Sequence, residues 1–213
     1  MIEVFIADDH EIVRKGLSTL IDETWDMKLI GEGKNGQEVL STICKKSCDV
    51  LILDISMPGI NGLDVLKQVK QLKPDLPVLI LSMHPENQYA RRMLKAGAAG
   101  YLNKESAATE LVKAIRKIYN GHKYISGSVA EILADDLADG DSDSRHEKLS
   151  DREFEIMQFI AKGITVSQIA DFLCLSVKTV STHRHHILEK LKLENNAQII
   201  CYALKHDLVD MEF

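Results

Sequence analysis

Short apolar runs alternate with amphipathic segments through the first 121 residues of the chain. The apolar runs that predict strands are Ile2–Ala7, Met27–Gly33, Val50–Asp54, Pro77–Ser82 and Ala99–Asn103. Apolar positions recur at helical spacing in His10–Glu23, Gly36–Lys45, Gly62–Gln71, Glu86–Ala96 and Ser106–Asn120. Runs such as VLILD have no polar alternation, which is typical of strands covered on both faces. The order predicts an α/β domain built on a doubly wound (βα)5 parallel sheet.

The pattern changes after Gly121. The segment GHKYISGSVAEILADDL predicts a short extra helix, and ADGDSDSRHEK has no periodicity and predicts a linker. From Leu149 onward only helical spacing remains, with helices near Asp151–Lys162, Thr165–Leu173, Val177–Leu191 and Ala197–His206. We therefore expect a sheet domain over residues 1–121, a linker with a short helix over 122–147 and a small all-α domain over 148–213.

Composition limits the class of protein. Of the 213 residues, 45% are hydrophobic and 27% are charged, which is typical of a globular chain. There is no basic leader before the first apolar run, and no apolar stretch approaches the roughly 20 residues of a membrane-spanning helix. We expect a cytoplasmic protein that does not enter a membrane. The four cysteines lack disulfide or zinc spacing, so we expect reduced thiols that pack in the interior.

Five polar residues fall where predicted strands end: Asp8, Asp9, Asp54, Ser82 and Lys104. Ligands of doubly wound sheets bind beyond the carboxyl ends of the strands, so these side chains are expected to meet. Carboxylates brought together repel one another unless a cation lies among them, and oxygen ligands favour Mg²⁺. Such a site suits phosphoryl transfer to a carboxylate, with a metal and a fixed cation neutralising the phosphoryl oxygens.

Each of these residues also has an ordinary structural explanation. Paired aspartates often cap a helix, and a lysine after a strand is usually solvated. The arrival of all five at one end of one sheet favours the functional interpretation. An enzyme is a competing hypothesis, since haloacid-dehalogenase phosphatases also use an aspartyl phosphate with Mg²⁺. Those enzymes carry a second Asp two residues after the nucleophile, where this chain has Ser56.

In the all-α part, Thr165–Leu173 and Val177–Leu191 are separated by a short connection, which is the layout of a helix-turn-helix. Ser176 is the expected N-cap of the second helix. The residues expected to pack inward are Val177, Val180, Ile187, Leu188 and Leu191, and those expected to face outward are Lys178, Thr179, Ser181, Thr182, His185 and His186. A helical module that binds protein instead of DNA remains an alternative.

The distribution of charge bears on whether this module binds DNA or protein. The formal net charge is −6, and Leu149–Phe213 has seven Lys and Arg against nine Asp and Glu, which is unusual for DNA binding. Lys178–Lys192 nevertheless has four cationic residues and one acidic residue, Glu189. Positive charge is concentrated on one helix.

The motifs ADDHEIVRKGL, LILDISMPGINGLDVL, LILSMH and AGAAGYLNKES resemble the receiver domains of bacterial two-component response regulators, over Met1 to about Gly121. The resemblance implies a flavodoxin-like fold in which Asp54 accepts a phosphoryl group. It also implies that Asp9 binds Mg²⁺ directly, that Asp8 acts largely through water, and that the backbone carbonyl of Ser56 is a third protein ligand.

Three further roles follow from that resemblance. Lys104 would pair with the phosphoryl group. The hydroxyl of Ser82 would move toward the acyl phosphate, and the rotamer of Tyr101 would follow it. His10 is expected to open the first helix without a chemical role.

Residues Leu149 to Leu204 resemble the LuxR-type helix-turn-helix of NarL/FixJ-class regulators. The resemblance implies that Ser181, Thr182 and His185 read base edges. It implies that the DNA backbone is contacted by Lys178, Thr179, His183 and Lys190. Relatives often carry Lys or Arg in place of Ser181 and His185, and Gly and Arg in place of Lys192 and Asn196, so base preference does not transfer.

Together these patterns predict a response regulator that is not itself an enzyme, beyond assisting its own phosphorylation and dephosphorylation. Its expected partners are a histidine kinase, double-stranded DNA and a second copy of the chain, with RNA polymerase as a further candidate. Helix-turn-helix modules often bind two-fold sites as dimers.

Overall fold

The structure is a computed structural model that describes residues 1–57, 59–83, 86–127, 129–131, 145–206 and 208–209. The chain divides into two compact units, Met1–Leu133 and Ala134–Phe213. Within the described residues, no helix combines the length and the apolar character needed to cross a lipid bilayer.

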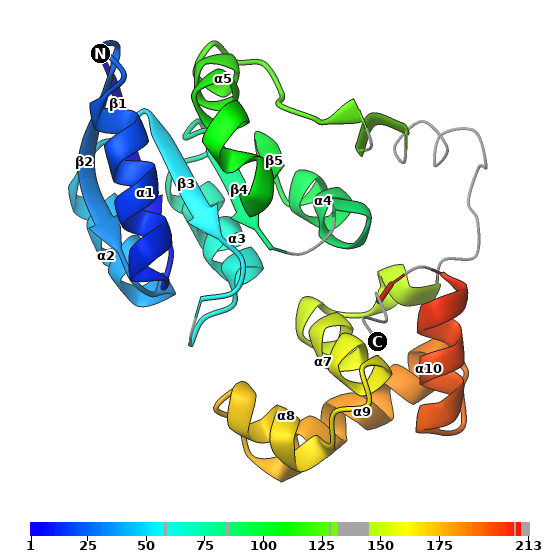
Figure 1. The fold of residues 1–213 in the computed structure, drawn as a ribbon. Helices are drawn as coiled ribbons and strands as arrows, with labels where there is room; N and C mark the ends of the chain where they lie inside the picture. The colour runs from blue at the N-terminus through cyan, green and yellow to red at the C-terminus, as the bar shows by residue number, and fades with distance from the viewer. Residues whose placement is uncertain (58, 84–85, 128, 132–144, 207, 210–213) are drawn as a thin grey trace. The chain divides into compact units, whose positions relative to one another are not determined.

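The first unit is a five-stranded sheet with helices between the strands (Figure 1). Its strands are β1 (Ile2–Ala7), β2 (Met27–Gly33), β3 (Val50–Asp54), β4 (Val78–Ser82) and β5 (Gly100–Asn103). Its helices are α1 (Glu11–Asp22), α2 (Gly36–Lys45), α3 (Gly62–Leu72), α4 (Glu86–Lys95) and α5 (Ala107–Tyr119), with the 3-10 turn η1 (Lys104–Ser106) before α5. The strand order is β2-β1-β3-β4-β5 and every pair is parallel, which confirms the predicted doubly wound (βα)5 fold.

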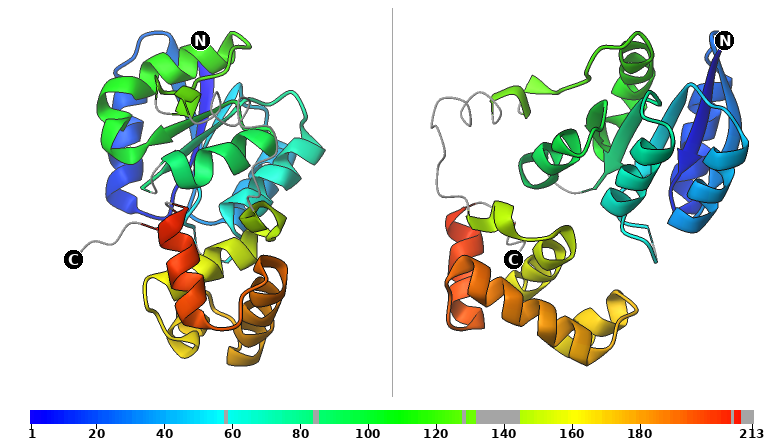
Figure 2. Two further views of the ribbon diagram at one scale, coloured as in Figure 1. Left: turned by 90° about the vertical axis from the view of Figure 1, so that its right-hand side faces the viewer. Right: turned by 180° about the vertical axis from the view of Figure 1, so that it is seen from behind.

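Helices cover both faces of this sheet, as the two views of Figure 2 show. α1 contacts α5, and α2 contacts α3. Between the sheet and the α1/α5 pair lies an apolar core that includes Val4, Ile52 and Leu79 from the strands, with Ile21 and Ile115 from the helices. β3 and β4 have no exposed residue, which explains why their sequences lack polar alternation.

Two of the predicted boundaries shift by a local physical cause. β4 begins at Val78 and not at Pro77, since proline has no backbone N–H to donate to a neighbouring strand. The fifth helix begins at Ala107 and not at Ser106, because residues Lys104–Ser106 form the 3-10 turn η1, in which the side chain of Asn103 accepts from the N–H of Glu105.

The chain stays on the sheet after α5. Gly121 turns it with a φ of 81°. The N–H of Tyr124 then donates to the carbonyl of Ala99 at 2.9 Å, and the N–H of Tyr101 donates to the carbonyl of Tyr124 at 3.4 Å. The hydroxyl of Tyr124 donates to Oε2 of Glu110 on α5 at 2.7 Å. The short extra helix and the linker predicted beyond this point lie largely outside the described residues.

The second unit contains the 3-10 turn η2 (Arg145–Lys148) and the helices α7 (Asp151–Ala161), α8 (Val166–Phe172), α9 (Val177–Leu191) and α10 (Asn196–Lys205). Four predicted helices are therefore confirmed. Each begins at a side-chain cap, and those of α7 and α8 are capping boxes formed by Ser150 with Glu153 and by Thr165 with Gln168. Cys174, with φ of 51°, makes the turn between α8 and α9.

All four cysteines are free. The expectation that they pack in the interior is wrong for Cys44, Cys174 and Cys201, which are exposed because they lie on turns or on the solvent faces of helices. Cys48 is half-buried beyond the end of α2, and burial raises the pKa of its thiol to about 11.

Candidate functional site

Three charged side chains meet at the carboxyl edge of the sheet. Asp8 follows β1, Asp54 ends β3 and Lys104 follows β5, and the strand order brings these ends together. Both carboxylates are 1% exposed. The Nζ of Lys104 lies 2.7 Å from Oδ2 of Asp8 and 2.8 Å from Oδ2 of Asp54. The predicted juxtaposition of these three residues is therefore present.

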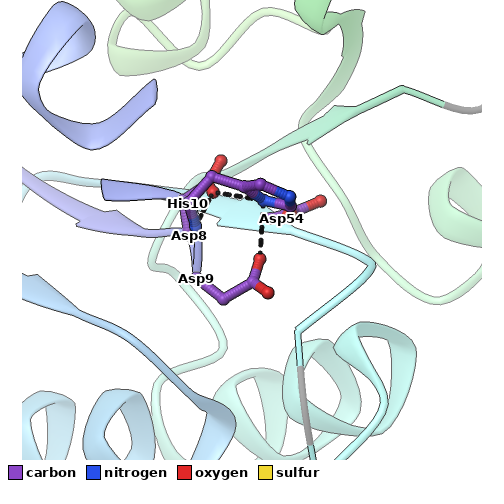
Figure 3. Close-up of side chains that lie close together, drawn as sticks. All are labelled: Asp8, Asp9, His10 and Asp54. Atoms are coloured by element: carbon purple, nitrogen blue, oxygen red, sulfur yellow. Dashed lines mark hydrogen bonds and ion pairs between the residues drawn. The ribbon is translucent and has the colours of Figure 1, made fainter. Parts of the chain in front are cut away.

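Asp9 and His10 complete the cluster (Figure 3). Nδ1 of His10 lies 2.8 Å from Oδ1 of Asp9 and 3.3 Å from Oδ1 of Asp8. Ligand atoms of Asp8, Asp9, His10 and Asp54 all lie within 4.8 Å of one another. His10 also serves as the N-cap position of α1, as expected, although its side chain makes no capping hydrogen bond.

The cluster has three carboxylates for one lysine. Burial raises the pKa of Asp54 despite the opposing effect of Lys104. Burial works to lower the pKa of Lys104, but pairing with Asp54 and Asp8 outweighs it and the pKa ends above its ordinary value. Oδ2 of Asp8 and Oδ1 of Asp9 are buried. Within the described residues, their contacts are ion pairs, of Asp8 with Lys104 and of Asp9 with His10, and neither oxygen accepts a further hydrogen bond. Three carboxylates with one lysine are consistent with a metal site.

Sequence reasoning missed Arg14. Its side chain is buried, its Nη1 donates to the backbone carbonyl of Asp8 at 2.7 Å, and its Nε donates to Oε2 of Glu32 at 3.2 Å. Through these two hydrogen bonds, Arg14 links the turn that contains Asp8 with the end of β2. The signal was available, because Arg14 lies on the same helical stripe as Leu17 and Ile21.

The loop after β3 approaches Asp54 closely. The N–H of Ser56 donates to Oδ1 of Asp54 at 3.1 Å, so Ser56 lies beside the carboxylate. A Cβ on Gly62 would lie 2.6 Å from Cα of Ile55 and 2.7 Å from the carbonyl of Asp54. Only glycine lets α3 begin this close to the strand end.

Ser82 and Tyr101 lie on the two strands beyond β3. Ser82 ends β4 and is 0% exposed, and Tyr101 lies on β5 and is 1% exposed. In the sheet register, Leu81 pairs with Asp54 and Ser82 pairs with Asn103. Ser82 is thus one residue beyond the neighbour of Asp54, and the switch roles of Ser82 and Tyr101 stay predictions.

In the second unit, α9 presents a polar face. Its exposed predicted DNA-contacting side chains are Lys178, Ser181, Thr182, His185 and Lys190, while Thr179 and His183 are half-buried. Ser176 caps the helix by accepting from the N–H of Thr179, as expected. The inward packing predicted for Val180, Ile187 and Leu191 is confirmed, since each is 0% exposed. Leu188 is half-buried.

Val177 departs from that prediction, because it is 51% exposed. As the first residue of α9, it lies one turn before the buried Val180.

Two residues predicted to contact the DNA backbone, Lys190 and His183, have surroundings that the sequence did not indicate. Nζ of Lys190 lies 2.6 Å from Oε2 of Glu153 on α7. Desolvation by burial lowers the pKa of His183, so its ring is held neutral more firmly than a free histidine. The sequence placed Glu153 in a helix but did not indicate its ion pair with Lys190.

Comparison with known proteins agrees with both halves of this description. Residues 4–116 match the family described as "Response regulator receiver domain", and residues 147–203 match "Bacterial regulatory proteins, luxR family". Response regulator UvrY of Escherichia coli K12 is 35% identical over 213 residues, covering 100% of this chain and 98% of UvrY. Response regulator GacA of Pseudomonas aeruginosa is 35% identical over 211 residues, covering 99% of each chain.

A similar solved structure is that of RcsB from Salmonella enterica serovar Typhimurium, bound to promoter rprA in the presence of phosphomimetic BeF3⁻. It aligns with a TM-score of 0.67 and 30% identity, over 94% of this chain and 97% of that one. At 94% of the chain, the match extends over both units. The chain therefore belongs to the two-component response regulators of the NarL/FixJ class, with a receiver domain followed by a DNA-binding domain of the LuxR family.

Proposed function

We propose that Asp54 accepts a phosphoryl group from a partner histidine kinase and that this controls DNA binding by α9. The observation that carries the proposal is the contact of Asp54 with Lys104 beside Asp8, at the edge of the sheet where Asp9 also lies. A buried carboxylate with one fixed cation and a metal-competent cluster has the parts that phosphoryl transfer requires.

Mg²⁺ is the metal that this donor set fits. Asp8, Asp9 and Asp54 supply carboxylate oxygens, which are hard ligands, and the backbone carbonyl of Ser56 is proposed as a further one. When bound, the ion would offset the negative charge of the phosphoryl oxygens. The nitrogen of His10 is a poorer ligand for Mg²⁺, and its position beside Asp9 supports a hydrogen-bonding role.

Lys104 would bind a phosphoryl oxygen, since its ammonium group already lies against Oδ2 of Asp54. Ser82 would donate its hydroxyl to another phosphoryl oxygen, and Tyr101 would change rotamer with it. Phosphorylation adds charge and strong acceptor oxygens, which can shift such a buried hydroxyl and bias a two-state surface. These same groups would assist phosphorylation from small donors and later hydrolysis.

For the second unit we propose binding of double-stranded DNA, with Ser181, Thr182 and His185 at base edges and Lys178, Thr179 and His183 at the backbone. Their places on α9 support this, together with the solved complex of RcsB with promoter DNA. A dimer on DNA, an interaction with RNA polymerase and a cytoplasmic location complete the proposal. We propose boundaries of 1–121, 122–147 and 148–213 for the receiver, the linker and the DNA-binding domain.

Labelling with radioactive acetyl phosphate tests the receiver half. The full chain should form a Mg²⁺-dependent acyl phosphate that Asp54→Asn abolishes. Asp64→Asn, which removes an exposed carboxylate in the first turn of α3, is the matched control and should label normally. An acyl phosphate that persists in Asp54→Asn would move the acceptor elsewhere.

Selection from a random DNA pool tests the other half. The full chain, with and without acetyl phosphate, should enrich a DNA motif in at least one state. No enrichment in either state would contradict DNA binding and favour a protein-binding helical module.

A further inference from the structure

α9 is divided into two halves by the contacts of its side chains. In the N-terminal half, Lys178, Ser181 and Thr182 are exposed. In the C-terminal half, the helix is tied to three neighbours: Arg184 Nε donates to Oδ1 of Asn196, Lys190 pairs with Glu153, and Arg145 Nη1 donates to the carbonyl of Leu191 at 2.8 Å. Lys178, Ser181 and Thr182 can therefore meet a ligand without breaking any of these three contacts.

Glu153 is the centre of these ties. Its side chain is 4% exposed. One oxygen, Oε2, accepts from the N–H of Ser150 at 2.6 Å and from Nζ of Lys190 at 2.6 Å. The other oxygen lies 3.6 Å from Nδ1 of His186. A single buried carboxylate therefore fixes both the first turn of α7 and the last turns of α9.

We propose that Lys190 is a positioning residue, which holds the recognition helix on α7 through Glu153 and does not neutralise a DNA phosphate. The inference rests on the proposed DNA binding and replaces one of its expected contacts. If Lys190 turned toward a phosphate, the carboxylate of Glu153 would stay buried without its cation, which is costly. Lys178 has no ion pair within the described part of the chain and lies at the exposed start of the helix.

Salt dependence separates the two roles. Each lysine that neutralises a phosphate adds about 0.9 to the slope of log affinity against log salt concentration. We would measure binding of the full chain to a mixed-sequence duplex over a range of salt. The variants are Lys190→Met, which keeps the aliphatic stem, and Lys178→Met as the matched control.

Lys178→Met should lower the slope by about 0.9, and Lys190→Met should leave it unchanged while weakening binding at every salt concentration. A drop of about 0.9 in Lys190→Met would overturn the proposal. Failure of the unaltered chain to bind any duplex would instead reject DNA binding itself.

Glu153→Gln is a second variant. A positioning role and a phosphate-contact role of Lys190 predict opposite changes in its affinity for DNA. Gln at this position still accepts from the N–H of Ser150, so the capping box survives and only the charge is lost. Positioning predicts weaker DNA binding, on the order of tenfold, and no additional loss when Lys190→Met is combined with it. Were Lys190 a phosphate contact, removing a nearby negative charge would strengthen binding, and that result would also overturn the proposal.

The unaltered chain provides a test that no folding defect can affect. Acetylation rates of individual lysines, read by mass spectrometry, should show Lys190 slow to react both in free protein and on DNA. Lys178 should react readily and become protected when DNA is added. Fast acetylation of Lys190 in free protein, with protection only on DNA, would contradict the ion pair with Glu153.

Discussion

The ammonium group of Lys104 lies 2.8 Å from Oδ2 of Asp54, across 50 residues of sequence. The same nitrogen lies 2.7 Å from Oδ2 of Asp8. One ammonium group therefore offsets the repulsion between two buried carboxylates. The contact depends on the order of the strands, because β5 and β1 lie on opposite sides of β3.

Lys104→Met should destabilise the receiver by about 3 kcal/mol, since it leaves two buried carboxylates without their cation. Added Mg²⁺ should restore part of the loss by binding the native state. Urea unfolding with and without Mg²⁺, followed by the fluorescence of the single tryptophan, Trp25, would measure both effects. An unchanged midpoint without Mg²⁺ would show that the carboxylates do not depend on Lys104.

Arg14→Met should weaken Mg²⁺ binding by roughly tenfold, as expected when the support of a metal ligand is removed. The cause is loss of the hydrogen bond to the carbonyl of Asp8, which fixes the turn carrying Asp8 and Asp9. Calorimetric titration with Mg²⁺ gives the affinity. Lys15→Met, on the exposed side of the same helix, is the control and should bind as tightly as the unaltered chain.

Glu153 should make the stability of the second unit depend on pH. Burial works to raise the pKa of Glu153, but the hydrogen bonds from Lys190 and Ser150 outweigh it and hold the pKa below 4.5. In the unfolded chain the carboxyl protonates first, so this contribution is complete above pH 4.5 and is lost as pH falls through the lowered native value.

The measurement is urea unfolding followed by NMR amide signals of α7 and α9 in the full chain. Between pH 4.5 and the lowered native pKa, Glu153→Gln should show a flatter decline in stability than the unaltered chain. Equal slopes for the two proteins would remove Glu153 as the cause.

Lys192→Gly should stabilise the second unit by about 1 kcal/mol. Lys192 closes α9 with φ of 58° and ψ of 48°, a left-handed conformation that side chains with a Cβ adopt at a cost. Its N–H donates to the carbonyl of Glu189, and glycine keeps that hydrogen bond. Lys178→Gly, within the same helix, should instead destabilise by about 1 kcal/mol. Thermal unfolding of both variants checks the opposite signs.

The sheet and its acidic edge were predictable because both follow from short-range pattern. Apolar runs set the strands, and parallel strands bring their carboxyl ends to one edge, so Asp8, Asp54 and Lys104 could be placed together. Pairings between helices were not predictable. The partner of Lys190 depends on how α9 packs on α7, and spacing within one helix does not report that.

The same limit explains Val177, since the exposure of a valine at a helix start depends on neighbouring elements. For Arg14, the helical stripe indicated burial, but its partners Asp8 and Glu32 depend on how α1 packs on the sheet. The metal, the acceptor role of Asp54 and the DNA contacts were predicted from the chemistry of the residues and from the family resemblance.

The pairing of Tyr124 with β5 bears on where the receiver can be cut from the rest of the protein. A chain ended at Gly121 would lose the hydrogen bonds at Ala99 and Tyr101 and leave the outer edge of the sheet open. Open strand edges recruit other chains and favour aggregation. A fragment ended at Glu131 should stay monomeric at concentrations where the shorter one precipitates, so a fragment made for experiments should keep the first residues of the linker beyond the proposed boundary at 121.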